Sequence, residues 1–142
     1  DGEATAREAD VIIFALGVND SAYLKSRDGR WTPPEEFRKN LVALFEKAQK
    51  RTLRIVCIGL ATIDEKKLQP APFAPDYYYD AKTVAEYNAV IKECCKEKGI
   101  LFIPMDDVLT LADLPDGLHP NVEGHRKMFE KIRAGLEESL SV

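Results

Sequence analysis

The sequence predicts an α/β domain built around a parallel sheet, and two observations lead to that class. Three short apolar runs, at 11–16, 54–60 and 100–104, are rich in β-branched or aromatic residues. They do not alternate apolar with polar residues, which is typical of strands buried on both faces. Segments with apolar residues at helical spacing follow each run. This alternation indicates parallel strands joined by right-handed crossovers.

Each predicted helix carries its own start or stop signals. The first is expected to begin at Thr32–Glu35, where Thr-Pro-Pro-Glu has the form of a capping box with proline at the first helical position. The second is expected to begin near Asp80 and end at Gly99, and the last to begin after Pro120–Asn121. Each helix carries apolar residues at helical spacing. In the first helix they are Phe37, Leu41, Leu44, Phe45 and Ala48. In the second they are Val84, Tyr87, Ile91 and Cys94, and in the last Met128, Phe129, Ile132, Leu136 and Leu140.

One long irregular segment, from Ala61 to about Tyr79, separates the second strand from the second helix. It contains three prolines and ends in three consecutive tyrosines, Tyr77–Tyr79. A loop of that length inside a compact domain is usually functional or mobile. We expect its tyrosines either to wall a substrate pocket or to cover the edge of the sheet. Trp31 is expected to anchor the start of the first helix, with a lid role as the alternative.

The composition limits the function classes. The chain has 142 residues, 45% of them hydrophobic and 31% charged, which is ordinary for a single domain spanning residues 1–142. Its net charge of −4 argues against binding to nucleic acid or to an anionic membrane surface, since both need clustered Lys and Arg. No apolar run approaches the ~20 residues that a membrane-spanning helix needs.

The cysteines and the carboxylates give no metal signature. Cys57, Cys94 and Cys95 lack metal-ligand spacing, and we interpret them as reduced thiols, which favour the cytoplasm. No signal peptide is visible, and the sequence leaves localisation open. Three carboxylates near His119 match no calcium or zinc pattern in their spacing, and we expect them to be solvated loop residues. They are Asp106, Asp107 and Asp113. We expect neither a metal nor a cofactor.

Three segments that could carry chemistry follow the ends of the predicted strands. They are Gly17–Asp20, Gly59–Thr62 and Asp116–His119. Ligands of an open α/β sheet bind at the carboxyl ends of its strands. We therefore expect the three segments to converge on one site.

Asp116 and His119 have the residue types and the spacing of an orienting acid and a general base. A histidine base needs a carboxylate on Nδ1–H so that Nε2 faces the nucleophile. In a tight turn, a spacing of three lets the aspartate fold back onto that nitrogen, and Gly117 can supply the backbone angle. The alternative is that Asp116 caps a turn beside a surface histidine. The surrounding pattern, Asp-Gly-Leu-His-Pro-Asn-x-x-Gly-His, favours the catalytic interpretation.

Asn19 is the candidate donor to an oxyanion. Its amide follows Gly17 at the end of the first strand, where it can stabilise developing negative charge. Asp20 is expected to hold the loop by accepting backbone N–H bonds. The alternative is a plain strand-ending turn, because Gly, Asn and Asp favour turns anyway. A nucleotide-binding function is disfavoured because no Gly-rich phosphate loop follows any strand.

Two of these segments together resemble the SGNH (GDSL-type) hydrolases. Gly17–Asp20 is similar to the third conserved block of that family, Asp116–His119 to the fifth, and Tyr87–Asn88 to a common family feature. The resemblance implies a flavodoxin-like three-layer α/β/α sandwich and metal-free ester hydrolysis by a serine nucleophile. It also implies that His119 is the base and Asp116 its orienter, and that the block containing Gly17 and Asn19 contributes to the oxyanion hole.

The sequence departs from that family in its nucleophile. It contains neither the Gly-Asp-Ser block nor a second-block glycine, both of which precede the third block in the family. The serines present are Ser21, Ser26, Ser139 and Ser141, of which only Ser21 lies near the expected site. We therefore expect roughly two N-terminal strand–helix units to be missing. The first strand would then be an exposed apolar edge, needing cover from a complementing N-terminal segment or a second copy.

The function expected from the sequence is that of a serine ester hydrolase acting on a small acyl or acetyl ester. This chain would supply Asp116, His119 and Asn19, and the serine would lie outside it. The alternative is a non-catalytic binding or assembly domain that has kept the scaffold and lost the serine.

Overall fold

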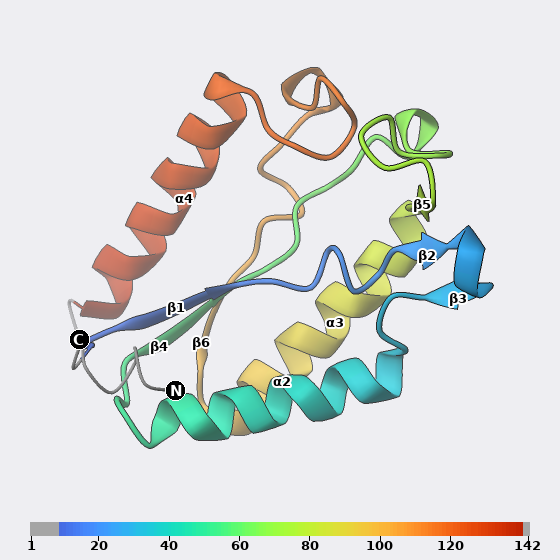
Figure 1. The fold of residues 1–142 in the computed structure, drawn as a ribbon. Coiled ribbons are helices and arrows are strands. Elements are labelled where there is room, and N and C mark those ends of the chain that lie inside the picture. Colours follow the sequence, from blue (N-terminus) through green and yellow to red (C-terminus); the bar gives the residue numbers. More distant parts are fainter. Residues whose placement is uncertain (1–8, 141–142) are drawn as a thin grey trace.

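The computed structural model describes residues 9–140 and the side chains of residues 9–139 (Figure 1). Two expectations, for the side chain of Leu140 and for Ser141, lie outside the described residues. The main sheet has three parallel strands in the order β1-β4-β6, namely β1 (Ile12–Ala15), β4 (Ile55–Ile58) and β6 (Leu101–Ile103). Three long helices flank it: α2 (Pro34–Gln49), α3 (Ala81–Lys98) and α4 (Val122–Leu140).

The central strand shows how the layers form. Ile55 and Cys57 point into the core shared with α2 and α3, whereas Val56 and Ile58 point towards α4. Figure 1 shows α2 and α3 on one face of the sheet and α4 on the other. The three-layer α/β/α arrangement with a parallel sheet is therefore confirmed.

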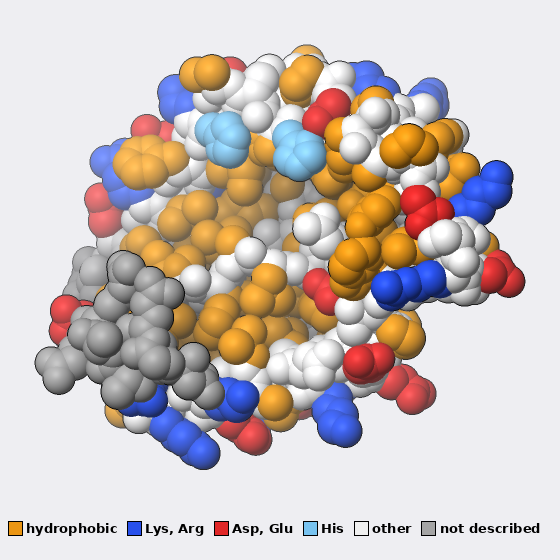
Figure 2. Space-filling view, in the orientation of Figure 1, with side chains coloured by type: hydrophobic (Ala, Val, Ile, Leu, Met, Phe, Trp, Pro, Cys, Tyr) orange, Lys and Arg blue, Asp and Glu red, His pale blue; other side chains and the backbone are white. Residues whose placement is uncertain are grey.

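The expectation that every strand is buried on both faces is wrong for β1. Ile12 and Phe14 pack on the α2–α3 side, but Ile13 is 47% exposed and Val11 and Ala15 are also exposed. The reason is position, because β4 is the sole partner of β1 within the described residues. Figure 2 shows hydrophobic side chains gathered in a hollow on this face, along the course of β1 and below α4.

The helix ends follow the sequence signals except at α2. Asp80 caps α3 by accepting from the backbone N–H of Thr83 (2.7 Å), and Gly99 ends α3 at φ +64°. The capping box expected at Thr32–Glu35 is wrong, although Pro34 is the first helical residue. Pro33 occupies the capping position, so Thr32 lies one residue too early and its hydroxyl instead donates to Asp20 (2.7 Å).

The apolar residues expected on the helices are not all buried. Leu44 on α2 and Phe129 on α4 are exposed. The expected residues that do pack in the core are Phe37, Leu41, Phe45 and Ala48 on α2 and Met128, Ile132 and Leu136 on α4. Within residues 9–140, no helix is long and apolar enough to cross a membrane.

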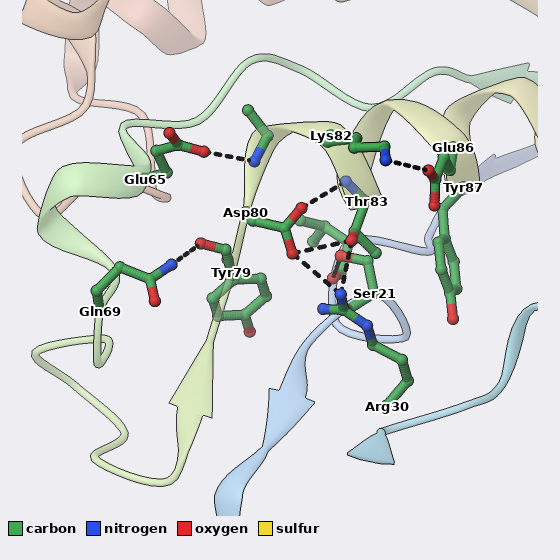
Figure 3. Close-up of polar contacts among 12 residues, drawn as sticks. Ser21, Arg30, Glu65, Gln69, Tyr79, Asp80, Lys82, Thr83, Glu86 and Tyr87 are labelled. Atoms are coloured by element: carbon green, nitrogen blue, oxygen red, sulfur yellow. Dashed lines mark hydrogen bonds and ion pairs between the residues drawn. The ribbon is translucent and has the colours of Figure 1, made fainter. Parts of the chain in front are cut away.

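A second, small antiparallel sheet was not expected. Its strands are β2 (Tyr23–Leu24), β3 (Gly29–Arg30) and β5 (Tyr77–Tyr78), in the order β3-β2-β5. Arg30 fixes this sheet to the start of α3, since its guanidinium donates to Asp80 (3.0 Å) and Thr83 (2.7 Å), and also to the carbonyl of Ser21 (3.0 Å). Figure 3 shows this cluster of polar side chains around the start of α3.

Candidate active site

The turn at Asp116–His119 brings an acid and a base into direct contact. One oxygen of Asp116 accepts from the backbone N–H groups of Leu118 (2.9 Å) and His119 (2.8 Å). The other lies 2.7 Å from Nδ1 of His119. Gly117 supplies the turn with φ +95°. The carboxylate thus occupies Nδ1 and leaves Nε2 available on a side chain that is 64% exposed.

The charge of Asp116 is stabilised by these same contacts. Partial burial acts to raise its pKa, but hydrogen bonds from the His119 backbone, the Leu118 backbone and the His119 ring outweigh it and lower the pKa to about 2. The carboxylate is therefore ionised near neutral pH. A negative oxygen at Nδ1 favours the tautomer with a proton on that nitrogen and a free lone pair on Nε2.

The long loop after β4 holds the turn in place from one side. The backbone N–H of Asp64 donates to the carbonyl of Gly117 (2.9 Å), and the ammonium of Lys67 donates to the carbonyl of Leu114 (2.9 Å). A Cβ added at Gly117 would lie 2.9 Å from the carbonyl oxygen of Asp64. The first part of the loop is therefore a packed support for the turn.

Asp113 holds the turn from the other side, and its expected role as a solvated carboxylate is wrong. It is buried, and both of its carboxylate oxygens accept from Lys127 on α4 (2.9 and 2.7 Å). The ion pair with Lys127 and bonds from Thr110 lower the pKa of Asp113 to about 2. Its backbone carbonyl accepts from Asn121 (2.8 Å). Asp106 and Asp107 are exposed, as expected.

Asn19 lies at the carboxyl end of β1 with its amide oxygen already occupied. The hydroxyl of Tyr79 donates to Oδ1 of Asn19 (3.3 Å), which directs the NH₂ group elsewhere. Tyr79 is buried, and burial raises its pKa to about 12, so it remains a donor near neutral pH. Gly17 has φ +116°, and an added Cβ would lie 3.0 Å from atoms of Phe37 and Ile91. This position therefore needs glycine.

The loop role expected for Asp20 is different in the structure. Its carboxylate accepts from the hydroxyl of Thr32 rather than from backbone N–H groups. Tyr87 and Asn88 support the same region, because Tyr87 donates to the carbonyl of Thr32 and Asn88 accepts from the backbone N–H of Leu60 (2.8 Å).

Ser21 does not have the environment of a nucleophile. It is 1% exposed, and its hydroxyl donates to the carbonyl of Val18 (2.6 Å). The hydroxyl of Ser26 is bonded to Asp76, and that of Ser139 to the carbonyl of Leu136. None of the serines described by the structure is hydrogen-bonded to His119. Ser21 is therefore buried and already hydrogen-bonded, unlike an exposed nucleophile.

The three segments that follow the strands do converge. A cavity of about 200 Å³ is lined by Val18, next to Asn19, by Gly59–Thr62 and by Leu118, next to His119. The histidine also contacts Phe73, whose ring lies edge-on at 4.9 Å from the imidazole and is 46% exposed. No motif in the sequence pointed to Phe73, which is a lone aromatic residue among prolines. Over residues 9–140, no group of three or more His, Cys, Asp or Glu is arranged to hold a metal.

A family model described as the GDSL-like lipase/acylhydrolase family matches residues 1–127. This chain belongs to that family. The SGNH (GDSL-type) resemblance drawn from the two sequence blocks is thus confirmed. An acetylxylan esterase of Xylanibacter ruminicola is 28% identical over 155 residues, a match that covers 95% of this chain and 30% of that protein.

Solved structures of the same architecture support the fold of this GDSL-like chain. An α/β hydrolase from the metagenome of Lake Arreo superposes with a TM-score of 0.71 at 16% identity, over 92% of this chain and 61% of that one. An acetylxylan esterase from Geobacillus stearothermophilus superposes with a TM-score of 0.70 at 17% identity, over 92% and 60%. The chain therefore spans about a third of the sequence relative and about three-fifths of these structures.

Proposed function

We propose that this protein is a serine ester hydrolase for small acyl esters, acetyl esters in particular, and that residues 1–142 form a single domain of it. The observation that carries the proposal is the 2.7 Å contact between Asp116 and Nδ1 of His119, with Nε2 left free on an exposed ring. Family membership and the acetylxylan esterase relatives support the ester substrate. The roles proposed below for the individual residues are supported by their contacts.

The reaction proceeds in two steps. Nε2 of His119 removes the proton of a serine hydroxyl as its oxygen attacks the acyl carbon, and the NH₂ of Asn19 donates to the resulting oxyanion. Collapse breaks the ester bond, and the departing alcohol takes the proton from His119. Water then attacks the acyl-enzyme by the same route and releases the acid and the serine. Asp116 holds the imidazole tautomer throughout and stabilises its positive charge.

The serine in this scheme is contributed by a complementing segment. The outer edge of β1 presents backbone N–H and C=O groups with no strand partner in the described structure, beside the exposed side chain of Ile13. Such an edge pairs readily with another strand. We propose that an N-terminal segment carrying Gly-Asp-Ser covers this edge and supplies the serine. A second copy of the chain would cover the same edge without supplying a nucleophile, because the sequence contains no Gly-Asp-Ser. The assembly of chain and serine-bearing segment is called the complemented enzyme below.

The competing function is a binding or assembly domain without catalysis. It is favoured by the burial of Ser21 and by the absence of a bond from any described serine to His119. Such a domain would bind an ester or a sugar and leave it intact, or would pair through the edge of β1.

The test is acetyl ester hydrolysis together with labelling by a fluorophosphonate probe, which reacts with activated serines. We expect the 142-residue chain to take up no label. A longer protein that includes the N-terminal segment with Gly-Asp-Ser should take up one equivalent of label and hydrolyse p-nitrophenyl acetate. His119→Ala should abolish both. His125→Ala is the matched control, because this second histidine is also exposed and lies nearby in the first turn of α4, and it should retain activity. An active His119→Ala protein, or no Gly-Asp-Ser upstream, would favour the binding function.

A further inference from the structure

A row of aromatic rings leads from Asn19 to the surface. Tyr79, which donates to Asn19, lies beside Tyr77, with ring centroids 6.5 Å apart and planes inclined by 29°. Tyr77 in turn contacts Trp31, at 5.5 Å and 33°. The guanidinium of Arg27 lies 5.4 Å from the centre of the Trp31 ring. The row therefore begins beside the proposed oxyanion donor and ends at a cation.

The row becomes progressively more exposed away from the site. Tyr79 is buried, Tyr77 is half-buried and Trp31 is 44% exposed. The backbone of both outer residues is held in place, since the N–H of Trp31 donates to the carbonyl of Ala22 (2.8 Å) and Tyr77 belongs to β5. Trp31 is therefore not a buried anchor, because nearly half of the residue is open to solvent.

This surface suits a ligand that is apolar on its ring faces and polar around its rim. Exposed aromatic surface beside a site is typical of ligand-binding grooves. Tyr and Trp combine a large apolar ring with a hydrogen-bonding group at its edge. A pyranose ring has the matching form, with C–H groups on its faces and hydroxyls on its rim. Arg27 adds hydrogen-bond donors for those hydroxyls at the outer end of the row.

We propose that Trp31 and Tyr77 form a subsite for a pyranose ring in the alcohol portion of the substrate. The ester bond of an acetylated oligosaccharide would then lie between Asn19 and His119, with neighbouring sugar residues on the aromatic row. This assignment rests on the proposed ester hydrolase function. An alkyl chain is the poorer occupant, because the row is open to solvent and ends at the charged Arg27.

The row can be tested by binding alone, because Trp31 is the single tryptophan of the sequence. We expect unacetylated xylotetraose to produce a saturable change in the intrinsic fluorescence of the 142-residue chain, with a Kd of order millimolar. Tyr77→Ala, which leaves the reporter in place, should weaken binding at least tenfold. Tyr77→Leu keeps most of the apolar volume but removes the ring, and it should also weaken binding at least tenfold. Phe129→Ala removes an exposed ring on α4 and should change nothing.

The outcomes separate this subsite from the hydrolase proposal. No saturable change in a chain that circular dichroism shows to be folded, or equal binding by Tyr77→Leu and wild type, would overturn the subsite. Xylotetraose carries no ester, so its binding does not depend on a working nucleophile. Binding without any acetyl ester hydrolysis by the complemented enzyme would overturn the hydrolase and leave the sugar-binding row standing.

Discussion

The carboxylate of Asp116 receives hydrogen bonds from two backbone N–H groups and from the ring of His119. Asp116→Asn would keep the size of the side chain but present an amide whose NH₂ favours the wrong imidazole tautomer. We expect kcat of the complemented enzyme to fall by several orders of magnitude with little change in KM. Steady-state hydrolysis of p-nitrophenyl acetate measures this, and a fall of less than tenfold would contradict the role of Asp116.

The same residue predicts a dependence of stability on pH. The pKa of Asp116 is lowered in the folded chain from 3.8 to about 2, so its ionised form stabilises the fold. This contribution is present above the ordinary pKa and is lost as pH falls towards about 2. The difference in melting temperature between wild type and Asp116→Asn should therefore shrink as pH is lowered from about 5 to about 2. Thermal melts across that range provide the check.

Tyr79 is predicted to position the oxyanion donor. Tyr79→Phe keeps the buried ring but removes the hydroxyl that fixes the amide of Asn19. Because the oxyanion forms only on the way to the intermediate, kcat should fall while KM stays constant. The loss should be smaller than the roughly 10²–10³ expected for Asn19→Ala. Tyr78→Phe, one residue away, is the control, and equal kinetics for the two variants would remove the role from Tyr79.

The contacts of single residues could be predicted from the sequence only where both partners belong to one local motif. Asp116 and His119 are three residues apart, so their contact follows from one turn. Tyr79 reaches Asn19 across 60 positions, and nothing in three consecutive tyrosines indicates which ring turns inward. Asp113 was misassigned for the same reason, because its partner Lys127 is on a different element.

At the scale of elements, Gly117 and Gly99 form a matched pair. Both have positive φ, at +95° and +64°, but an added Cβ meets backbone and side chains only at Gly117. Gly99→Ala should cost about 1 kcal/mol of unfolding free energy for its left-handed backbone. Gly117→Ala should cost about 1–3 kcal/mol more and also lower kcat, since Asp116 and His119 flank it. Urea unfolding measures the difference, and equal costs would contradict the clash.

The helices and parallel strands were predictable because they are long or strongly apolar. Asp80 and Gly99 bound α3 as expected, since each signal acts within one helical turn. The strands of the small antiparallel sheet contain two residues each, which is too short to show a period. That sheet depends on a long-range tie, from Arg30 to Asp80 and Thr83, which no local pattern reveals.

At the scale of the whole molecule, the layers followed from the order of elements, and within residues 9–140 the outer edge of β1 has no strand partner. We expect the isolated chain to self-associate as its concentration rises, because a strand edge that is apolar and unpaired, as that of β1 is among the described residues, recruits partners. Ile13→Lys should shift it to monomer without unfolding it, since Ile13 is already 47% exposed. Leu53→Lys changes an exposed position outside the strands and should leave self-association unchanged. Sedimentation velocity distinguishes these cases, and a wild-type chain that stays monomeric would contradict the expectation.

The hydrogen bond from the backbone amide of Asp64 to the carbonyl of Gly117 makes the opening of the candidate site measurable. That amide is protected from solvent hydrogen only while the turn carrying Asp116 and His119 is closed against it. Its hydrogen–deuterium exchange rate therefore reports how often the turn opens, without substrate and without a nucleophile. A single amide resonance can thus rank ligands and variants by how firmly they hold the acid and the base together.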